Sequence, residues 1–206
     1  PVLSRGLGDV YKRQNQSIFW ENRYKKEEIG WDLGVETPVF TALSDTLDSG
    51  KVCILGCGNG YDAILFSKKG FSVTAVDFAE TPIHNLETNA RSLSLSIETI
   101  KKDIFDLTPD YSSQFDYIIE QTCFCAIDPL KREQYSNLVY DLLKVGGKLI
   151  GLWMPLDKDI DEGGPPFGVK EDEIKMLFSN KWKITADYFP NQSIEARKGR
   201  EKSVSY

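Results

Sequence analysis

The sequence has little of the chemistry on which many catalytic and metal sites depend. Its 206 residues include a single histidine, His84, and only four cysteines. No two cysteines are spaced as C-x-x-C, and one histidine adds too little for a zinc site, so both metal binding and a disulfide framework are disfavoured. A second histidine for an acid–base pair is absent as well. We therefore expect a site without a metal, and we assign no catalytic acid or base.

Long apolar runs and an excess of positive charge are also absent. No stretch approaches the ~20 residues of a membrane-spanning helix. The chain has 25 lysines and arginines against 31 acidic residues, a formal net charge of −6. One short basic run, 197–202, is expected to be a solvated strand end, so nucleic acid is disfavoured as a partner. Cysteines without disulfide spacing favour a cytoplasmic location.

The first fourteen residues are expected not to belong to the natural protein. Residues 4–14 read SRGLGDVYKRQ, which a transposase-type sequencing adapter encodes codon by codon. We therefore expect native sequence to begin near Asn15. Residues 15–206 are then long enough for a single domain with a sizeable core.

Three glycines at alternate positions follow a short apolar run. The loop contains Gly56, Gly58 and Gly60, and a second apolar run ends in Asp77. This pattern predicts a strand, a tight loop, a helix and a second strand, with the acid at a strand tip where it can bind a ribose. The spacing is not the dinucleotide fingerprint G-x-G-x-x-G, whose third glycine is replaced by Tyr61. It favours S-adenosylmethionine (SAM) over a nicotinamide dinucleotide.

Apolar periodicity predicts a Rossmann-like, doubly wound α/β sheet, because strands and helices alternate along most of the chain. The predicted strands are 51–56, 71–77, 96–101, 115–120 and 147–154. The predicted helices are 17–26, 37–47, 61–69, 81–93, 130–144 and 170–178. Two further alternating runs, 181–189 and 193–199, predict a terminal antiparallel hairpin.

Five separated blocks carry a family resemblance. They are FWENRY through GWDLG (19–34), LGCGNGYD (55–62), QTCFCAIDP (121–129), GGPPF (163–167) and SIEARKG (193–199). Together they resemble the thiopurine S-methyltransferase family of class I SAM-dependent methyltransferases, which includes the plant halide/thiol methyltransferases. The resemblance spans nearly all of 15–206 and implies a seven-stranded sheet with its last strand antiparallel.

The resemblance also implies which residues hold SAM. Aromatic residues of the N-terminal segment would lie over it, the glycine loop under its methionine arm, and a strand-end acid at its ribose. A second acid would flank the adenine, and a third would lie near the amino-acid end. In chain order, the implied cofactor-binding residues are Trp20, Tyr24, Trp31, Gly56, Gly58, Gly60, Asp77, Phe78, Asp103, Ile104 and Glu120.

For the acceptor pocket, the candidates are Phe124, Met154 and Phe167. The loop 157–168 is expected to act as a lid, with Phe167 closing the pocket. The chain departs from the family pattern at two positions. Tyr24 stands where a tryptophan is frequent, and Met154 stands where the plant enzymes have a tyrosine, which disfavours halide as the acceptor.

The function expected from these features is methyl transfer to a small soft nucleophile, such as a thiol, bisulfide or a thiopurine-like sulfur. A soft anion needs no general base, which agrees with the missing dyad. We expect a monomer that acts on a small molecule. Three alternatives remain open: a halide, oxygen or nitrogen acceptor on the same fold, a nicotinamide-dependent oxidoreductase, and a SAM-binding module without turnover.

Overall fold

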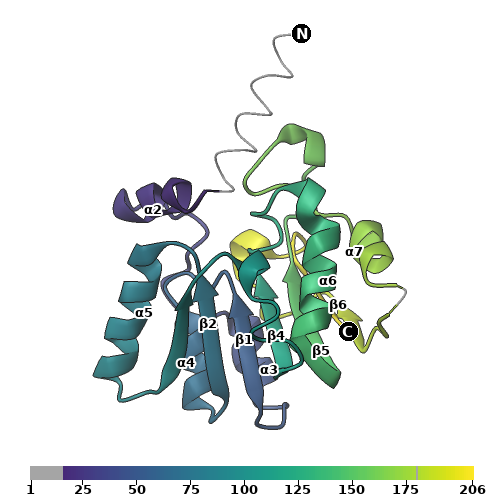
Figure 1. The fold of residues 1–206 in the computed structure, drawn as a ribbon. Helices are drawn as coiled ribbons and strands as arrows, with labels where there is room; N and C mark the ends of the chain where they lie inside the picture. Colours follow the sequence, from purple (N-terminus) through teal and green to yellow (C-terminus); the bar gives the residue numbers. More distant parts are fainter. Residues whose placement is uncertain (1–15, 180) are drawn as a thin grey trace.

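Seven strands form one sheet in the order β3-β2-β1-β4-β5-β7-β6 (Figure 1). The computed structural model describes residues 16–179 and 181–206, so the predicted non-native segment 1–14 lies outside the described residues. The strands are β1 (Lys51–Leu55), β2 (Ser72–Asp77), β3 (Ile97–Lys101), β4 (Phe115–Gln121), β5 (Leu143–Trp153), β6 (Ala186–Tyr188) and β7 (Lys202–Ser205). The first five pair in parallel, whereas β7 runs antiparallel to both of its neighbours. This confirms the predicted sheet.

Helices alternate with the strands, close to the predicted bounds. The α-helices are α2 (Ser17–Lys25), α3 (Pro38–Ser44), α4 (Tyr61–Lys68), α5 (Glu80–Ser92), α6 (Arg132–Leu142) and α7 (Glu171–Leu177). Single 3₁₀ turns are η1 (Ile104–Asp106), η2 (Pro129–Lys131), η3 (Ile160–Glu162) and η4 (Glu195–Arg197). None of the helices in the described ranges is long and apolar enough to cross a membrane.

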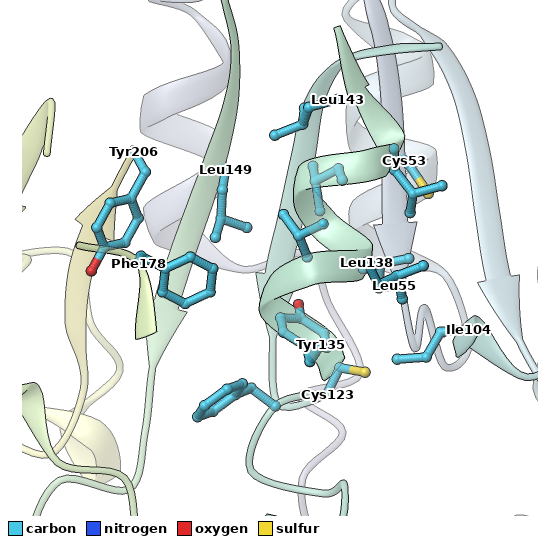
Figure 2. Packing of buried hydrophobic residues seen from close by; sticks show 14 of the residues in the cluster. Cys53, Leu55, Ile104, Cys123, Tyr135, Leu138, Leu143, Leu149, Phe178 and Tyr206 are labelled. Carbon is cyan, nitrogen blue, oxygen red and sulfur yellow. The ribbon is translucent and has the colours of Figure 1, made fainter. Parts of the chain in front are cut away.

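The two faces of the sheet carry separate apolar clusters. Cys53 and Leu55 of β1 belong to the cluster that includes residues of α6 and α7, whereas Val52 and Ile54 belong to the cluster of α3 and α4. Successive side chains of a strand point to opposite faces, so one strand feeds both clusters. Figure 2 shows the first cluster, which Tyr135 of α6 joins. Burial on both faces explains why the strands read as continuous apolar runs.

The prediction that residues 193–199 form the second strand of a terminal hairpin was wrong. Residues 193–199 contain the turn η4 instead of a strand, and β6 pairs with β7, at Lys202–Ser205. The apolar alternation that suggested a strand comes from Ile194 and Ala196, which face a cavity. The true strand lies between β5 and β6 and is buried along its whole length, so its sequence KSVS shows no apolar period.

Replacing a buried leucine of α6 by alanine should reveal how much its packing in the core contributes to the free energy of unfolding. We expect Leu142→Ala to lower the free energy of unfolding by roughly 2–5 kcal/mol, because Leu142 of α6 is fully buried and its removal leaves a cavity. Leu130→Ala is the matched control, since this leucine is 92% exposed, and it should change the free energy by no more than about 0.5 kcal/mol. Urea unfolding measures both. Equal losses would contradict the assigned packing of α6.

Candidate active site

A cavity of about 440 Å³ opens where the parallel strands end. Loops after β1, β2, β3, β4 and β5 border it, together with the segment from α2 to residue 33 and the turn η4. Such a crevice at the carboxyl ends of the strands is the usual ligand site of an open α/β sheet. Sequence-predicted residues that line the cavity are Trp20, Tyr24, Trp31, Gly56, Asp77, Phe78, Asp103, Ile104 and Met154.

Each glycine of the loop has a different close neighbour that leaves no room for a side chain. All three have positive φ angles, +63° at Gly56, +54° at Gly58 and +79° at Gly60, which side chains rarely adopt. A Cβ at Gly56 would lie 3.0 Å from the sulfur of Cys123, and one at Gly58 would lie 3.0 Å from the Tyr24 hydroxyl. The loop therefore passes directly beneath side chains that border the cavity.

Asp77 is held rigidly at the end of β2. Its Oδ2 accepts from the backbone N–H of Gly58 at 3.1 Å, and its Oδ1 accepts from that of Ala79 at 2.9 Å. Burial raises the pKa of the Asp77 carboxyl to about 6, against the lowering effect of these hydrogen bonds. The carboxylate is only 7% exposed, yet it lines the cavity. It is thus fixed where a ligand hydroxyl can reach it.

The side of the cavity beyond β3 combines an acid with apolar side chains. Asp103 begins the turn η1, and its Oδ1 accepts from the backbone N–H of Phe105 at 3.1 Å. Ile104 and Phe105 follow it in the lining, and the ammonium of Lys131 lies 4.9 Å from the centre of the Phe105 ring. Apolar surfaces with an acid beside them are suited to a planar heterocycle that carries donor groups.

An aromatic group from the N-terminal segment covers the cavity. The Trp31 ring packs edge to face against Trp20 and Tyr24, with ring centres 5.4 and 5.7 Å apart. The guanidinium of Arg23 lies 5.1 Å from the centre of Trp31. Aromatic faces attract cations, and Arg23 makes such a contact with Trp31 at the edge of the cavity.

Comparison with known proteins identifies the family. The family model described as thiopurine S-methyltransferase (TPMT) matches residues 15–206. The chain belongs to the thiopurine S-methyltransferase family. It is 31% identical over 204 residues to probable thiol methyltransferase 2 of Arabidopsis thaliana, covering 97% of this chain and 88% of that protein. It is 27% identical over 186 residues to a thiopurine S-methyltransferase of Pseudomonas fluorescens, covering 81% and 83%.

Solved structures agree with the fold. A didemethyltoxoflavin N1-methyltransferase from Burkholderia thailandensis, solved with S-adenosylhomocysteine, superposes with a TM-score of 0.70 at 16% identity, covering 92% of this chain and 85% of that one. A SAM-dependent methyltransferase from Clostridium acetobutylicum gives 0.68 at 15% identity, covering 90% and 97%. The chain is a SAM-dependent methyltransferase, as its family and fold together show.

Two aromatic candidates for the acceptor pocket do not line the cavity of this methyltransferase. Phe124 is 1% exposed and packs against Trp153 and Tyr135, with ring centres 5.0 and 5.5 Å away. Phe167 is fully buried, and its backbone N–H donates to the carbonyl of Cys125 at 2.7 Å. Both rings are therefore part of the buried interior and not of the lining. The loop 157–168 contributes Pro165 and Pro166 to the lining instead.

Glu120 also lies outside the lining. Its Oε1 accepts from the backbone N–H of Phe124 at 2.8 Å, and its Oε2 accepts from the Tyr135 hydroxyl. The side chain is 1% exposed, and burial raises the pKa of its carboxyl to about 7. Figure 2 shows Tyr135 and Cys123 in this part of the core. The carboxylate therefore holds the loop after β4 and does not line the cavity.

Two further acids beside the glycine loop, Asp32 and Asp62, line a second, smaller cavity of about 70 Å³ together with Gly58. Oδ1 and Oδ2 of Asp62 accept from the backbone N–H and the hydroxyl of Thr37, at 2.8 and 2.9 Å. Burial raises the pKa of the Asp62 carboxyl to about 6. Asp32 accepts from the Asn59 amide at 2.6 Å. Sequence reasoning missed both acids, although they lie inside the family blocks.

The basic run 197–202, expected to be solvated, is solvated only in part: Lys198 and Arg200 are exposed, whereas Arg197 and Lys202 are buried. Arg197 is 7% exposed and donates to the carbonyl of Trp31 at 2.8 Å. When the amide of Gln121 is oriented to satisfy both its ends, its oxygen accepts from Arg197 at 2.9 Å. Arg197 and Arg200 line the main cavity with Ile194. Two arginines close together in an acidic chain were the signal available in the sequence. The prediction of a strand at 193–199 led us to expect them to be solvated.

Gly60 lines neither cavity, and a glycine is required there because a neighbouring side chain packs closely against it. A Cβ there would collide with the side chain of Leu86, which is fully buried on α5. We expect Gly60→Ala to lose roughly 1–2 kcal/mol of unfolding free energy to the left-handed backbone and about 1–3 kcal/mol more to overpacking. Gly70→Ala is the control, because its φ is +86° but nothing lies within 4 Å. Urea unfolding that shows equal losses for the two would contradict this packing.

Proposed function

We propose that this methyltransferase transfers the methyl group of SAM to a small, soft sulfur nucleophile: a thiol, bisulfide or a thiopurine-like sulfur. The observation that carries the proposal is the wall beyond β5. There the polarisable side chains of Met154 and Cys125 lie with Pro165 in the same lining as the guanidinium groups of Arg197 and Arg200. Arg197 is buried, with the Glu201 carboxylate 4.0 Å from its Nη1, whereas Arg200 is exposed and pairs with Asp157. A buried guanidinium beside soft, apolar atoms suits a small anion that is weakly hydrated.

The names of the relatives support the same acceptor class. Thiocyanate methyltransferase 1 of Arabidopsis thaliana is 31% identical to this chain over 188 residues, and 89% of this chain is covered. Thiol, thiocyanate and thiopurine are the acceptors that the relatives' names give. All three present a sulfur atom. The family assignment also removes the basis for the nicotinamide-dependent alternative.

The residues of the main cavity fit SAM. Gly56 lines this cavity, and any side chain there would crowd Cys123. Asp77, fixed by two backbone N–H groups, would bind the ribose hydroxyls. Asp103 and Ile104 would flank the adenine, with Trp20, Tyr24 and Trp31 as the roof. Asp32 and Asp62, in place of Glu120, are the acids available to the α-ammonium group. When bound, SAM supplies a methyl group on a positively charged sulfur, already activated for displacement.

The chain's own contribution is alignment and exclusion of water. The roof and the wall of Pro165 and Ile194 would enclose the reacting atoms, which would strengthen the attraction between Arg197 and an anion. A nucleophile that is already anionic donates no proton, so the site requires no general base. This agrees with the lining, in which Cys123 and Cys125 have thiol pKa values raised by burial and so remain protonated.

The domain, assembly and location remain proposals. We propose that residues 15–206 form one methyltransferase domain, since the family match begins at residue 15. A monomer is sufficient, because the described residues of one chain line the whole cavity. The cytoplasmic location stays a prediction.

The ribose role of Asp77 predicts a pH-dependent affinity for S-adenosylhomocysteine. Hydroxyl groups donate to the anionic carboxylate and favour it, so affinity should be full above the Asp77 pKa of about 6 and fall as the pH drops through it. At pH 8, Asp77→Asn should weaken binding by roughly 1–3 kcal/mol. Calorimetric titration from pH 5 to 8 measures both effects.

Comparing the pH profiles of the wild type and Asp77→Asn distinguishes the titration of Asp77 from that of Asp62, whose pKa is also about 6. As the pH falls, the affinity of the wild type should decrease more steeply than that of Asp77→Asn, because the variant lacks the protonation of Asp77. Parallel pH profiles with equal affinity at pH 8 would assign the ribose to another residue.

The acceptor is tested by the formation of S-adenosylhomocysteine from SAM with matched concentrations of bisulfide, thiocyanate, a small thiol, a thiopurine, iodide, a catechol and an amine. We expect turnover with sulfur acceptors and slower turnover with iodide, since Met154 replaces the tyrosine of the plant enzymes. Turnover with only the catechol or the amine would contradict the proposal. Binding of SAM without any turnover would indicate a binding module.

A further inference from the structure

The helix α2 carries much of the roof, yet little of it is buried. Only Glu21 and Tyr24 are buried among its nine residues, and its N-cap residue Gln16 makes no side-chain capping bond. A helix of this length is marginal by itself in water. Figure 1 shows α2 beside one end of α5, the element that it contacts. Its position over the cavity must therefore depend on a few specific contacts.

Glu21 makes the most directed of these contacts. Its Oε2 accepts from the backbone N–H groups of Glu80 and Thr81, both at 2.9 Å, and its Oε1 accepts from the Thr81 hydroxyl at 2.7 Å. Burial alone would raise the pKa of the Glu21 carboxyl, but the hydrogen bonds from Thr81 and the charge of Lys25 lower it to about 2. The carboxylate is therefore ionised at any pH at which the enzyme works.

These donors are the free N–H groups at the start of α5. A helix normally satisfies such groups with the side chain of its own N-cap residue. Here the N-cap residue is Ala79, which has no side-chain acceptor. Glu21 supplies the missing cap from a different helix, and its negative charge also matches the positive end of the α5 dipole.

This trans cap joins the roof to the cofactor-binding loop. Ala79 follows Asp77 and Phe78, both of which line the cavity, and its N–H donates to Asp77. On the other side, Glu21 adjoins Trp20, and Tyr24 follows one helical turn later; both line the same cavity. One carboxylate thus links the two surfaces that would enclose the adenosyl part of the cofactor.

We propose that Glu21 is a positioning residue that docks α2 over the cofactor cavity and so sets how tightly the cofactor is retained. The inference rests on the proposed function of the site. If binding needs α2 docked, the apparent Kd equals the intrinsic Kd divided by the docked fraction. Losing Glu21 lowers that fraction, whereas a bound cofactor restores docking through its own contacts with Trp20 and Tyr24.

The test is the Kd of S-adenosylhomocysteine by calorimetry, with its dissociation rate by stopped-flow tryptophan fluorescence. Glu21→Ala should raise the Kd about tenfold or more, because charge-assisted hydrogen bonds are lost, and mainly through faster dissociation. The KM for SAM should rise in parallel, while kcat at saturating SAM stays within about twofold of wild type. Glu21→Gln keeps an acceptor oxygen and should recover part of the affinity.

Two controls match this change. Glu80→Ala removes a carboxylate from the same helix end that pairs with Lys101 at the surface, and Lys25→Ala removes the exposed partner of Glu21. Both should leave the Kd within about twofold, as expected for surface ion pairs. Thr81→Ala removes one of the three contacts and should give an intermediate Kd.

Thermal unfolding of each variant separates positioning from folding. A lower Tm for Glu21→Ala with an unchanged Kd would overturn the inference, since Glu21 would then only cap α5. So would equal loss of affinity in Glu21→Ala and Glu80→Ala. If the wild-type protein failed to bind S-adenosylhomocysteine, the proposed function would fall and this inference with it. Wild-type binding with an unaffected Glu21→Ala variant would overturn the inference alone.

Discussion

The carboxylate of Asp77 is the contact on which the site depends. One oxygen holds the glycine loop through Gly58, and the other holds the start of α5 through Ala79. Both bonds are largely removed from water, so a lost partner would leave N–H groups unsatisfied. The loop, the strand β2 and the helix therefore keep one relative arrangement. The cavity is the space that this arrangement leaves open.

The roof over the cavity comes from segments near the two ends of the described chain, which meet at a few polar contacts. Glu21 fixes α2 to the helix that begins beside Asp77, and Arg197 fixes Trp31 to the turn η4. Arg197 and Trp31 are separated by 166 positions in the chain. The roof is therefore joined to the rest of the fold by these polar contacts as well as by the packing of its aromatic rings.

The parts of the site that local sequence could predict are those that local geometry determines. The glycine spacing requires positive φ angles, and a strand end directs Asp77 to the edge of the sheet, so both were placed at the cavity without any tertiary information. Glu120 is a strand-end acid too, but Tyr135 of α6 turns its carboxylate inward. The same limit applies to Phe124, whose ring packs on Trp153. Partners distant in sequence decide where these side chains point, and no local pattern records them.

The most direct test of this account is a crystal structure of residues 15–206 with S-adenosylhomocysteine. The account predicts that the ribose hydroxyls lie within hydrogen-bonding distance of Asp77. It also predicts that the adenine lies beside Ile104, and that the sulfur faces the wall formed by Met154 and Arg197. A cofactor bound with its ribose away from Asp77, or with its sulfur facing away from that wall, would contradict the assignment of the site and of its soft anionic acceptor.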